Sequence, residues 1–185
     1  MSDAVAGVLS SLDKIVFDAE TIQLRVAEIA AEIVRDYQGQ ELDVVALMDG
    51  ALFFVVDLLR SVPLPVRVHT VSVRSYHGGT SSTGTVQLLQ RLPAGLEGRT
   101  VLLIDDILDT GLTLATVQDQ LITACQPATL RTAVLLRKQR PRDREPLVEY
   151  VGFDIPDEFV VGYGMDYQGH YRNLPCIGVL SESAI

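Results

Sequence analysis

Apolar residues along the chain follow two different spacings. Between residues 18 and 37 they recur every three or four positions, the spacing of one helix face, at Ile22, Val26, Ile29 and Ile33. Shorter apolar runs between turn signals predict strands at residues 43–48, 66–73, 85–90, 101–104 and 129–138. The segments 51–62 and 110–125 are predicted to be further helices.

Strands that are apolar on both faces and alternate with helices predict an α/β fold, with a mostly parallel central sheet flanked by helices. We expect a single domain over residues 1–185, with its core at about 15–145. After residue 145 the pattern becomes irregular, which indicates a small C-terminal cap over about 146–185. Ligands of such folds gather at loops beyond the carboxyl ends of the strands, here 48–50, 74–84, 105–110 and 137–144.

The composition is that of an ordinary globular protein, with 48% hydrophobic and 21% charged residues among 185. A formal net charge of −9 argues against a protein that coats nucleic acid, because phosphate contacts need clustered Lys and Arg. The two cysteines show no metal-ligand spacing and are expected to be reduced thiols. Because no basic leader or apolar run of about 18 residues is present, we expect a cytoplasmic protein that does not bind membranes.

Three carboxylates follow one predicted strand within five residues, at Asp105, Asp106 and Asp109. Like charges this close raise each other's pKa and oppose folding unless a partner offsets them. The adjacent pair can accept hydrogen bonds from a ribose diol or hold a hard cation such as Mg²⁺, and Asp109 can accept a proton. The plain alternative is a helix N-cap at Asp109 beside a solvated turn, but a cap needs only one carboxylate.

The residues that come next predict a phosphate site. DTGLT (109–113) opens a predicted helix, whose first backbone N–H groups and dipole favour a bound anion. Thr110 and Thr113 can add hydroxyl donors, and Gly111 lets the backbone approach a ligand closely. The segment is not a Walker A loop, since no Lys follows the glycine and no first glycine stands at the required spacing.

The string LLIDDILDTGLT resembles the phosphoribosyl-diphosphate (PRPP) binding motif of the type I phosphoribosyltransferases. More narrowly, the chain is similar to the hypoxanthine-guanine members of that family. The supporting segments fall in family order over roughly residues 15 to 180: LMDGALFFVVDLLR, VRSY, LLRK and VGFDIPDEFVVGYGMDYQGHYRNLP. One acidic motif alone would be moderate evidence of kinship, whereas five ordered segments are specific.

The resemblance assigns a role to each part of the acidic motif. Asp105 and Asp106 would bind the ribose hydroxyls of PRPP. Asp109 would face N7 of a purine as general acid or base. The carboxylates would also stabilise positive charge on the ribose in an oxocarbenium-like transition state. The 5′-phosphate would be held by the backbone and hydroxyls of Asp109, Thr110, Gly111, Leu112 and Thr113.

The same resemblance implies a base pocket near the C-terminus. Lys138 would donate to the 6-oxo group of a purine, Phe159 would stack on its ring, and the main chain of Val160 would bind its edge. Asp166 would lie near a Mg²⁺–pyrophosphate group, and Arg172 would contact the pyrophosphate. Read without the family, residues 159–161 are simply a strand, Asp166 and Arg172 a surface pair, and Lys138 a solvated member of the basic run 137–144.

Two further loops carry family features. Ser75-Tyr76 matches the dipeptide of a closing loop and precedes a Gly, Ser and Thr-rich stretch; the neighbouring His77 has no assigned role. Met48, Asp49 and Gly50 fall where relatives bind pyrophosphate, with a Lys or Arg at the position of Met48 and a cis peptide before it. Met48 supplies no charge and Asp49 adds an anion, so pyrophosphate binding by this loop is in question.

The resemblance implies a Mg²⁺-dependent enzyme of purine salvage that converts hypoxanthine or guanine and PRPP to IMP or GMP and pyrophosphate. Asp105, Asp106 and Asp166 are the expected metal neighbours, and relatives form dimers or tetramers. Xanthine differs from hypoxanthine only at C2, so a transferase for another base stays open. A PRPP- or nucleotide-sensing regulator of the same fold would need an extended basic face. A phosphate-accepting signalling domain would carry its acidic pair well before the acceptor aspartate.

Overall fold

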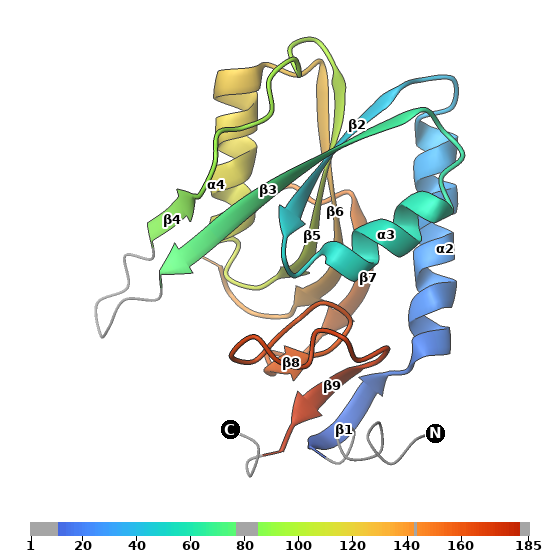
Figure 1. Ribbon diagram of the computed structural model, residues 1–185, viewed down its shortest axis with the longest axis vertical. Helices are drawn as coiled ribbons and strands as arrows, with labels where there is room; N and C mark the ends of the chain where they lie inside the picture. Colours follow the sequence, from blue (N-terminus) through green and yellow to red (C-terminus); the bar gives the residue numbers. More distant parts are fainter. Residues whose placement is uncertain (1–10, 77–84, 143, 182–185) are drawn as a thin grey trace.

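The computed structural model describes residues 11–76, 85–142 and 144–181. Its larger sheet has six strands in the order β4-β3-β2-β5-β6-β7 (Figure 1). These are β4 (Thr85–Leu88), β3 (Val66–Tyr76), β2 (Leu42–Met48), β5 (Thr100–Leu108), β6 (Thr129–Lys138) and β7 (Tyr150–Ile155). Five neighbouring strands of this sheet are parallel, namely β3, β2, β5, β6 and β7, and the edge strand β4 is antiparallel to β3. The predicted α/β fold is therefore confirmed.

Helices cover both faces of this sheet. Helices α2 (Ala19–Asp36) and α3 (Leu52–Arg60) lie on one face, and α4 (Leu112–Gln120), continued by a π-helical turn (Leu121–Cys125), lies on the other (Figure 1). Each face has its own apolar core. Along β5, Leu102 and Ile104 belong to the core under α2 and α3, whereas Val101 and Leu103 belong to the core under α4. This alternation explains why four successive residues of the strand, 101–104, are all apolar.

The boundaries of α2 follow from its sequence. Asp18 caps the helix, because its side chain accepts a hydrogen bond of 2.8 Å from the N–H of Thr21. The predicted apolar face is fully buried, and the chain leaves the helix at Tyr37 and turns at Gly39 with φ of 76°. No helix in the described part of the chain is long and apolar enough to cross a membrane.

A second sheet joins both ends of the described chain. Its antiparallel strands are β1 (Leu12–Phe17), β9 (Ile177–Leu180) and β8 (Val160–Val161), in the order β1-β9-β8. We call this sheet, with the loop 162–176 between β8 and β9, the hood. It lies beyond the carboxyl ends of the larger sheet (Figure 1). The cap predicted for residues 146–185 therefore begins later and includes an N-terminal strand, because β7 pairs with β6 and β1 pairs with β9.

Strand β5 is longer than the predicted strand 101–104. Its pairing with β2 stops at Ile104, but its pairing with β6 continues from Asp105 opposite Val134 to Leu108 opposite Arg137. Asp105 and Asp106 are therefore strand residues. The sequence pattern had placed them at the start of a loop, and that prediction is wrong. The helix after them begins at Leu112, two residues later than predicted.

Candidate active site

The carboxyl ends of β2, β5 and β6 bring three of the predicted loops together. The loop after β2 contacts the acidic pair, since a Cβ atom on Gly50 would collide with the carboxylate of Asp106. On its other side this loop meets the hood, because a Cβ atom on Gly164 would collide with the carbonyl oxygen of Gly50. Gly164 requires glycine, because it meets backbone and has φ of 105°, whereas the close approach at Gly50 is to a side chain. The loop 48–50 is thus held between the acidic pair and the hood.

The acidic pair carries charge that the described protein does not neutralise. Asp105 is 8% exposed, and burial together with the charge of Asp106 raises its pKa well above the usual range. Burial also raises the pKa of Asp106, against the opposing effect of the Arg172 guanidinium. Their nearest donors are backbone N–H groups: Asp106 donates to Asp105 at 3.0 Å and Ile107 donates to Asp106 at 2.9 Å. Such a pair favours a hydroxyl donor or a cation as ligand.

The predicted phosphate loop lies between β5 and α4. Gly111 has φ of 79°, and a Cβ atom there would collide with the carbonyl oxygen of Arg144, so only glycine fits. The hydroxyl of Thr110 accepts a hydrogen bond of 3.4 Å from the N–H of Leu112. Thr113 lies in the first turn of α4 and is half-buried. The remaining N–H groups of this turn are available to an anion in the way that helix starts bind phosphate.

Asp109 and Lys138, both singled out in the sequence, form an ion pair. Lys138 Nζ lies 2.8 Å from one carboxylate oxygen of Asp109, and Arg140 Nη1 lies 2.9 Å from the other. Both cations also contact Asp157, Lys138 at 3.4 Å and Arg140 at 3.2 Å. The Lys138 side chain is only 8% exposed, so the alternative interpretation, that Lys138 is a solvated surface lysine, is wrong.

The basic run 137–144 does not form a free anion-binding patch. Arg142 is 7% exposed and donates from Nε to the carbonyl oxygen of Asp109 at 2.8 Å and from Nη2 to the carbonyl oxygen of Lys138. Arg137 pairs with Asp154 at 2.6 Å, and Arg144 pairs with Asp119 at 2.7 Å. The run therefore connects the loop after β6 to the predicted phosphate loop, through the bond from Arg142 to Asp109, and to nearby acidic side chains.

The hood and the residue just before it, Phe159, supply the predicted aromatic and pyrophosphate residues. Phe159 is 51% exposed and lies edge-to-face with Tyr167, at 5.8 Å between ring centres, whereas Val160 is buried in β8. Arg172 pairs with Asp166 at 2.8 Å and donates to the carbonyl oxygen of Gly164 at 2.6 Å. A large exposed aromatic ring is suited to stacking on a flat ligand.

Asp105, Asp106 and Asp166 do not form one metal centre. Among the described residues no group of three or more metal-ligating side chains is found, and Asp166 is engaged by Arg172 and by the N–H of Gly169 at 2.7 Å. Mg²⁺ is commonly bound through one or two carboxylates together with substrate phosphates and water. The acidic pair fits that kind of site, because no ion pair to Asp105 or Asp106 is found among the described residues.

The loop after β2 departs from the expected geometry by one bond. The cis peptide lies between Met48 and Asp49, whereas the resemblance placed it before Met48. Met48 is half-buried and packs at the edge of the core under α2 and α3, and Asp49 is exposed. Arg172 is the cation whose charge reaches the acidic pair beside this loop.

The closing-loop dipeptide lies at the end of β3. Ser75 pairs with Val86 and Tyr76 with Thr85, so the backbone leaves the sheet as one arm of an antiparallel pair. His77 and the stretch up to residue 84 lie outside the described residues.

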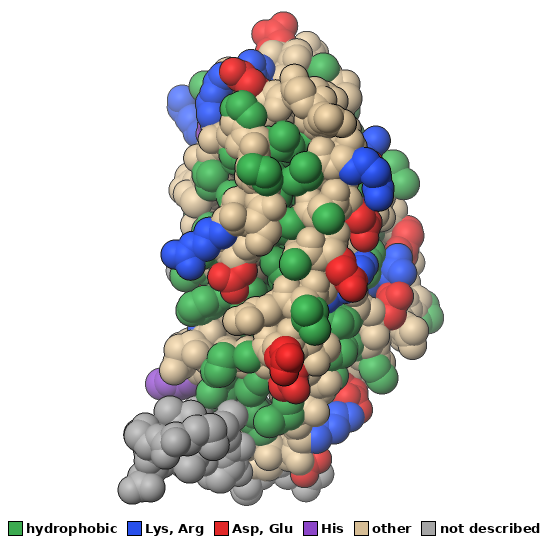
Figure 2. Space-filling view, turned by 90° about the vertical axis from the view of Figure 1, so that its right-hand side faces the viewer, with side chains coloured by type: hydrophobic (Ala, Val, Ile, Leu, Met, Phe, Trp, Pro, Cys, Tyr) green, Lys and Arg blue, Asp and Glu red, His purple; other side chains and the backbone are tan. Residues whose placement is uncertain are grey.

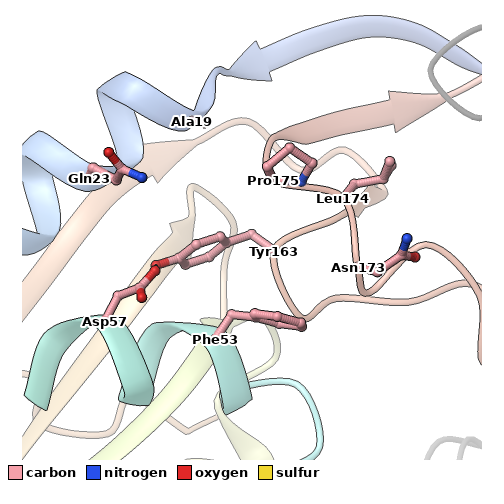
Figure 3. A pocket seen from close by; sticks show the side chains of 8 residues that line it. All are labelled: Ala19, Gln23, Phe53, Asp57, Tyr163, Asn173, Leu174 and Pro175. Atoms are coloured by element: carbon pink, nitrogen blue, oxygen red, sulfur yellow. The ribbon is translucent and has the colours of Figure 1, made fainter. Parts of the chain in front are cut away.

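One cavity of about 180 Å³ lies apart from these residues, between α2, α3 and the hood (Figure 3). It is lined by Ala19, Gln23, Phe53, Asp57, Tyr163, Asn173, Leu174 and Pro175. Tyr163 donates its hydroxyl to Asp57 at 2.7 Å, and burial raises its pKa. Its ring lies 6.2 Å from that of Phe53. These contacts attach the hood to α3 directly behind the loop 48–50.

The fold and the site define a phosphoribosyltransferase. The family model of the phosphoribosyl transferase domain matches residues 14–168, and the chain belongs to this family. The chain is 42% identical over 175 residues to the hypoxanthine-guanine phosphoribosyltransferase of Mycobacterium avium, a match that covers 91% of this chain and 86% of that protein. It is 40% identical over 171 residues to the enzyme of that name from Staphylococcus aureus, covering 92% and 95%.

Solved structures agree with these relatives. A hypoxanthine phosphoribosyltransferase from S. aureus superposes with a TM-score of 0.90 at 39% identity and covers 96% of both chains. A hypoxanthine phosphoribosyl transferase from Trypanosoma cruzi, studied for the role of its C-terminal region in oligomeric state and activity, gives 0.86 at 36% identity, covering 94% and 93%. The family predicted from the sequence is confirmed.

The sequence did not single out four residues that shape the site. Arg140, Arg142 and Asp157 act through contacts with Asp109 and Lys138, and Tyr163 attaches the hood. The excess of basic over acidic residues from 137 to 145 was the available signal, because so many neighbouring cations favour anionic partners elsewhere in the fold.

Proposed function

We propose that this protein transfers the 5-phosphoribosyl group of PRPP to hypoxanthine or guanine and releases pyrophosphate. Similarity to enzymes of that name extends over more than nine-tenths of the chain. The structural observation that carries the proposal is the contact between Lys138 and Asp109, because it sets a donor for a 6-oxo group beside an acceptor for an N7 proton.

Three groups of residues would bind PRPP. The ribose hydroxyls would donate to Asp105 and Asp106, whose excess charge makes a hydroxyl donor favourable. The 5′-phosphate would accept from the first turn of α4 and from Thr110 and Thr113. Arg172 would contact the pyrophosphate, since its charge already reaches the acidic pair.

The base would lie between the hood and the end of β6. Phe159 would stack on its ring, the main chain of Val160 would bind its edge, and Lys138 would donate to its 6-oxo oxygen. Asp109 would take the proton that leaves N7 as the new bond to the ribose forms. The three nearby carboxylates of 105–109 would stabilise positive charge on the sugar as the bond to pyrophosphate breaks.

We propose Mg²⁺ as the cofactor. When bound it neutralises the pyrophosphate that leaves. Asp105 and Asp106 would hold it together with PRPP, because burial raises the pKa of both carboxyl groups and a bound metal ion would stabilise their charged forms. Asp166 would approach it only with pyrophosphate in place, since Arg172 engages it otherwise.

We propose further that the protein forms a homodimer or homotetramer and acts in the cytoplasm. Helix α3 exposes three large apolar residues, Leu52, Phe53 and Val56, each between 38% and 43% exposed, and a second copy would cover them. On the face shown in Figure 2, basic and acidic side chains are interspersed and form no single basic patch, which does not favour a nucleic-acid partner on that face.

The decisive experiment is an assay of nucleotide formation with PRPP and Mg²⁺, offering hypoxanthine, guanine, xanthine, adenine, uracil and orotate separately. We expect turnover with hypoxanthine and guanine. Turnover of another base alone would keep the PRPP site and overturn the roles of Lys138 and Phe159. Binding of PRPP without turnover of any base would favour the sensing regulator, with Met48 and Asp49 as the suspected cause.

A further inference from the structure

Four charged side chains form a closed ring at the end of β6. Asp109 contacts Lys138 at 2.8 Å and Arg140 at 2.9 Å, and Asp157 contacts the same two cations at 3.4 Å and 3.2 Å. Two carboxylates thus share two cations. Arg140 and Asp157 have no role in the binding scheme above, although they complete this ring.

The ring fixes Asp109 at both oxygens. Oδ2 accepts from Lys138 and Oδ1 accepts from Arg140. Under the proposed function Lys138 has to donate to the 6-oxo group of the base, so its bond to Asp109 weakens when the base binds. Arg140 then remains as the side-chain donor to Asp109, and its contact is charge-assisted.

Asp157 restrains Arg140 from the other side. It lies on the segment between β7 and β8, so it links the larger sheet to the hood strand that follows. The guanidinium also has a buried Nε atom without a hydrogen-bond partner among the described residues, so it keeps a donor for a further acceptor. Arg140 is therefore placed to keep contact with Asp109 while the other partners of the ring change.

We propose that Arg140 is a positioning residue for the transfer: anchored by Asp157, it holds the carboxylate of Asp109 toward N7 of the base when Lys138 turns to the 6-oxo group. This inference rests on the proposed function. It adds a residue that supports the reaction through Asp109 and does not touch the sugar phosphate.

The test compares two arginines of the same basic run. Arg140→Gln removes the contact to Asp109, and Arg144→Gln is the matched control, since Arg144 pairs with Asp119 on the surface at 2.7 Å. With hypoxanthine, Arg140→Gln is expected to lower kcat about tenfold and leave the KM for PRPP within about twofold, because a charge-assisted bond is lost only beside the base. Arg144→Gln is expected to leave both constants unchanged.

Two more variants separate positioning from folding. Arg140→Lys keeps one cation and is expected to recover part of the lost kcat. Asp157→Asn is expected to lower kcat less than Arg140→Gln, because Asp157 contacts Asp109 only through the two cations. The double variant Arg140→Gln with Asp157→Asn is expected to lose less than the two single losses multiplied together, because Asp157 acts in part through the arginine.

The outcomes distinguish this inference from the function on which it rests. Equal kinetics of Arg140→Gln and Arg144→Gln, in a wild-type protein that turns over hypoxanthine, would overturn the role of Arg140 alone. A loss in Arg140→Gln that appears in thermal stability and in the KM for PRPP, without a fall in kcat, would overturn it as well. A wild-type protein that transfers to no base would overturn both.

Discussion

Two buried aspartates on neighbouring strands of one sheet have pKa values shifted in opposite directions. Asp43, near the start of β2, is 1% exposed and is bonded to His69 at 2.9 Å and to Arg99 at 2.8 Å. Burial acts to raise its pKa, but these two hydrogen bonds and the charges of Arg99 and Arg67 together outweigh burial and lower the pKa. Asp105, toward the end of β5, is similarly buried, and its neighbour is another carboxylate, so its pKa is raised.

The difference supports the proposal that the carboxyl ends of the strands bind ligand, while the amino ends contribute to stability. At the amino ends of the strands, Arg99 also pairs with Glu41, and the charges are balanced within the protein. At the carboxyl ends, Asp105 and Asp106 are left for a ligand to balance, which costs stability in the free protein. Asp109 is an intermediate case. Its charge is paired within the protein, but one of its partners is Lys138, which a bound base would engage.

The largest expected effect is on catalysis at the ligand-binding end. Asp109→Asn should lower kcat by about 100-fold or more, because the amide cannot take a proton from N7. The KM for PRPP should stay nearly unchanged, since the backbone of the phosphate loop is retained. Initial rates with hypoxanthine measure both constants. An unchanged kcat would remove Asp109 from the chemistry.

At the opposite end, the expected effect is on stability. Asp43→Asn should lower the free energy of unfolding by about 2 kcal/mol at pH 7, because a buried carboxylate between two partners is replaced by a neutral amide. Urea unfolding followed by circular dichroism measures the loss. The matched control is Glu41→Gln, because the exposed carboxylate of Glu41 pairs with the same Arg99 and should contribute less to stability than Asp43. Equal losses in the two variants would contradict the distinction between buried and exposed partners.

Removal of one hydroxyl from the phosphate loop should have a smaller effect. Thr113→Val keeps the volume of the side chain and removes a donor to the 5′-phosphate, so the KM for PRPP should rise about tenfold while kcat changes little. Steady-state rates at varied PRPP and saturating hypoxanthine give both values. An unchanged KM for PRPP would mean that the hydroxyl of Thr113 does not bind the 5′-phosphate.

Much of the architecture could be predicted because its signals are local. Apolar spacing located α2, β2 and β6 to within one or two residues, and the glycine and threonines of the phosphate loop were visible as a motif. The ion pairs of Asp109 could not be read in the same way, because they depend on register. Leu108 pairs with Arg137, which brings Asp109 beside Lys138 across 29 residues of sequence. Likewise, β7 pairs with β6 in the larger sheet and β1 pairs with β9 in the hood, and no local sequence pattern predicts either partner.

The smallest effect, and the sharpest test of the comparison, is the dependence of stability on pH. The pKa of Asp43 is lowered in the folded protein, so its contribution is present above the ordinary value of 3.8 and is lost as pH falls through the lower, folded value. The pKa of Asp105 is raised, so the folded state binds that proton more tightly. Its contribution is then favourable at low pH and is lost as pH rises from 3.8 through the raised value.

Asp105→Asn should therefore leave the free protein as stable as wild type at pH 4 and more stable, by about 1 kcal/mol, at pH 7, because the neutral amide removes a buried charge that lacks a protein partner. Asp43→Asn should do the reverse, with its loss larger at pH 7 than at pH 4. Urea unfolding of both variants at the two pH values measures the four differences. If Asp105→Asn instead destabilises the free protein at pH 7, the acidic pair is balanced within the protein, and the contrast between the two ends of the sheet fails.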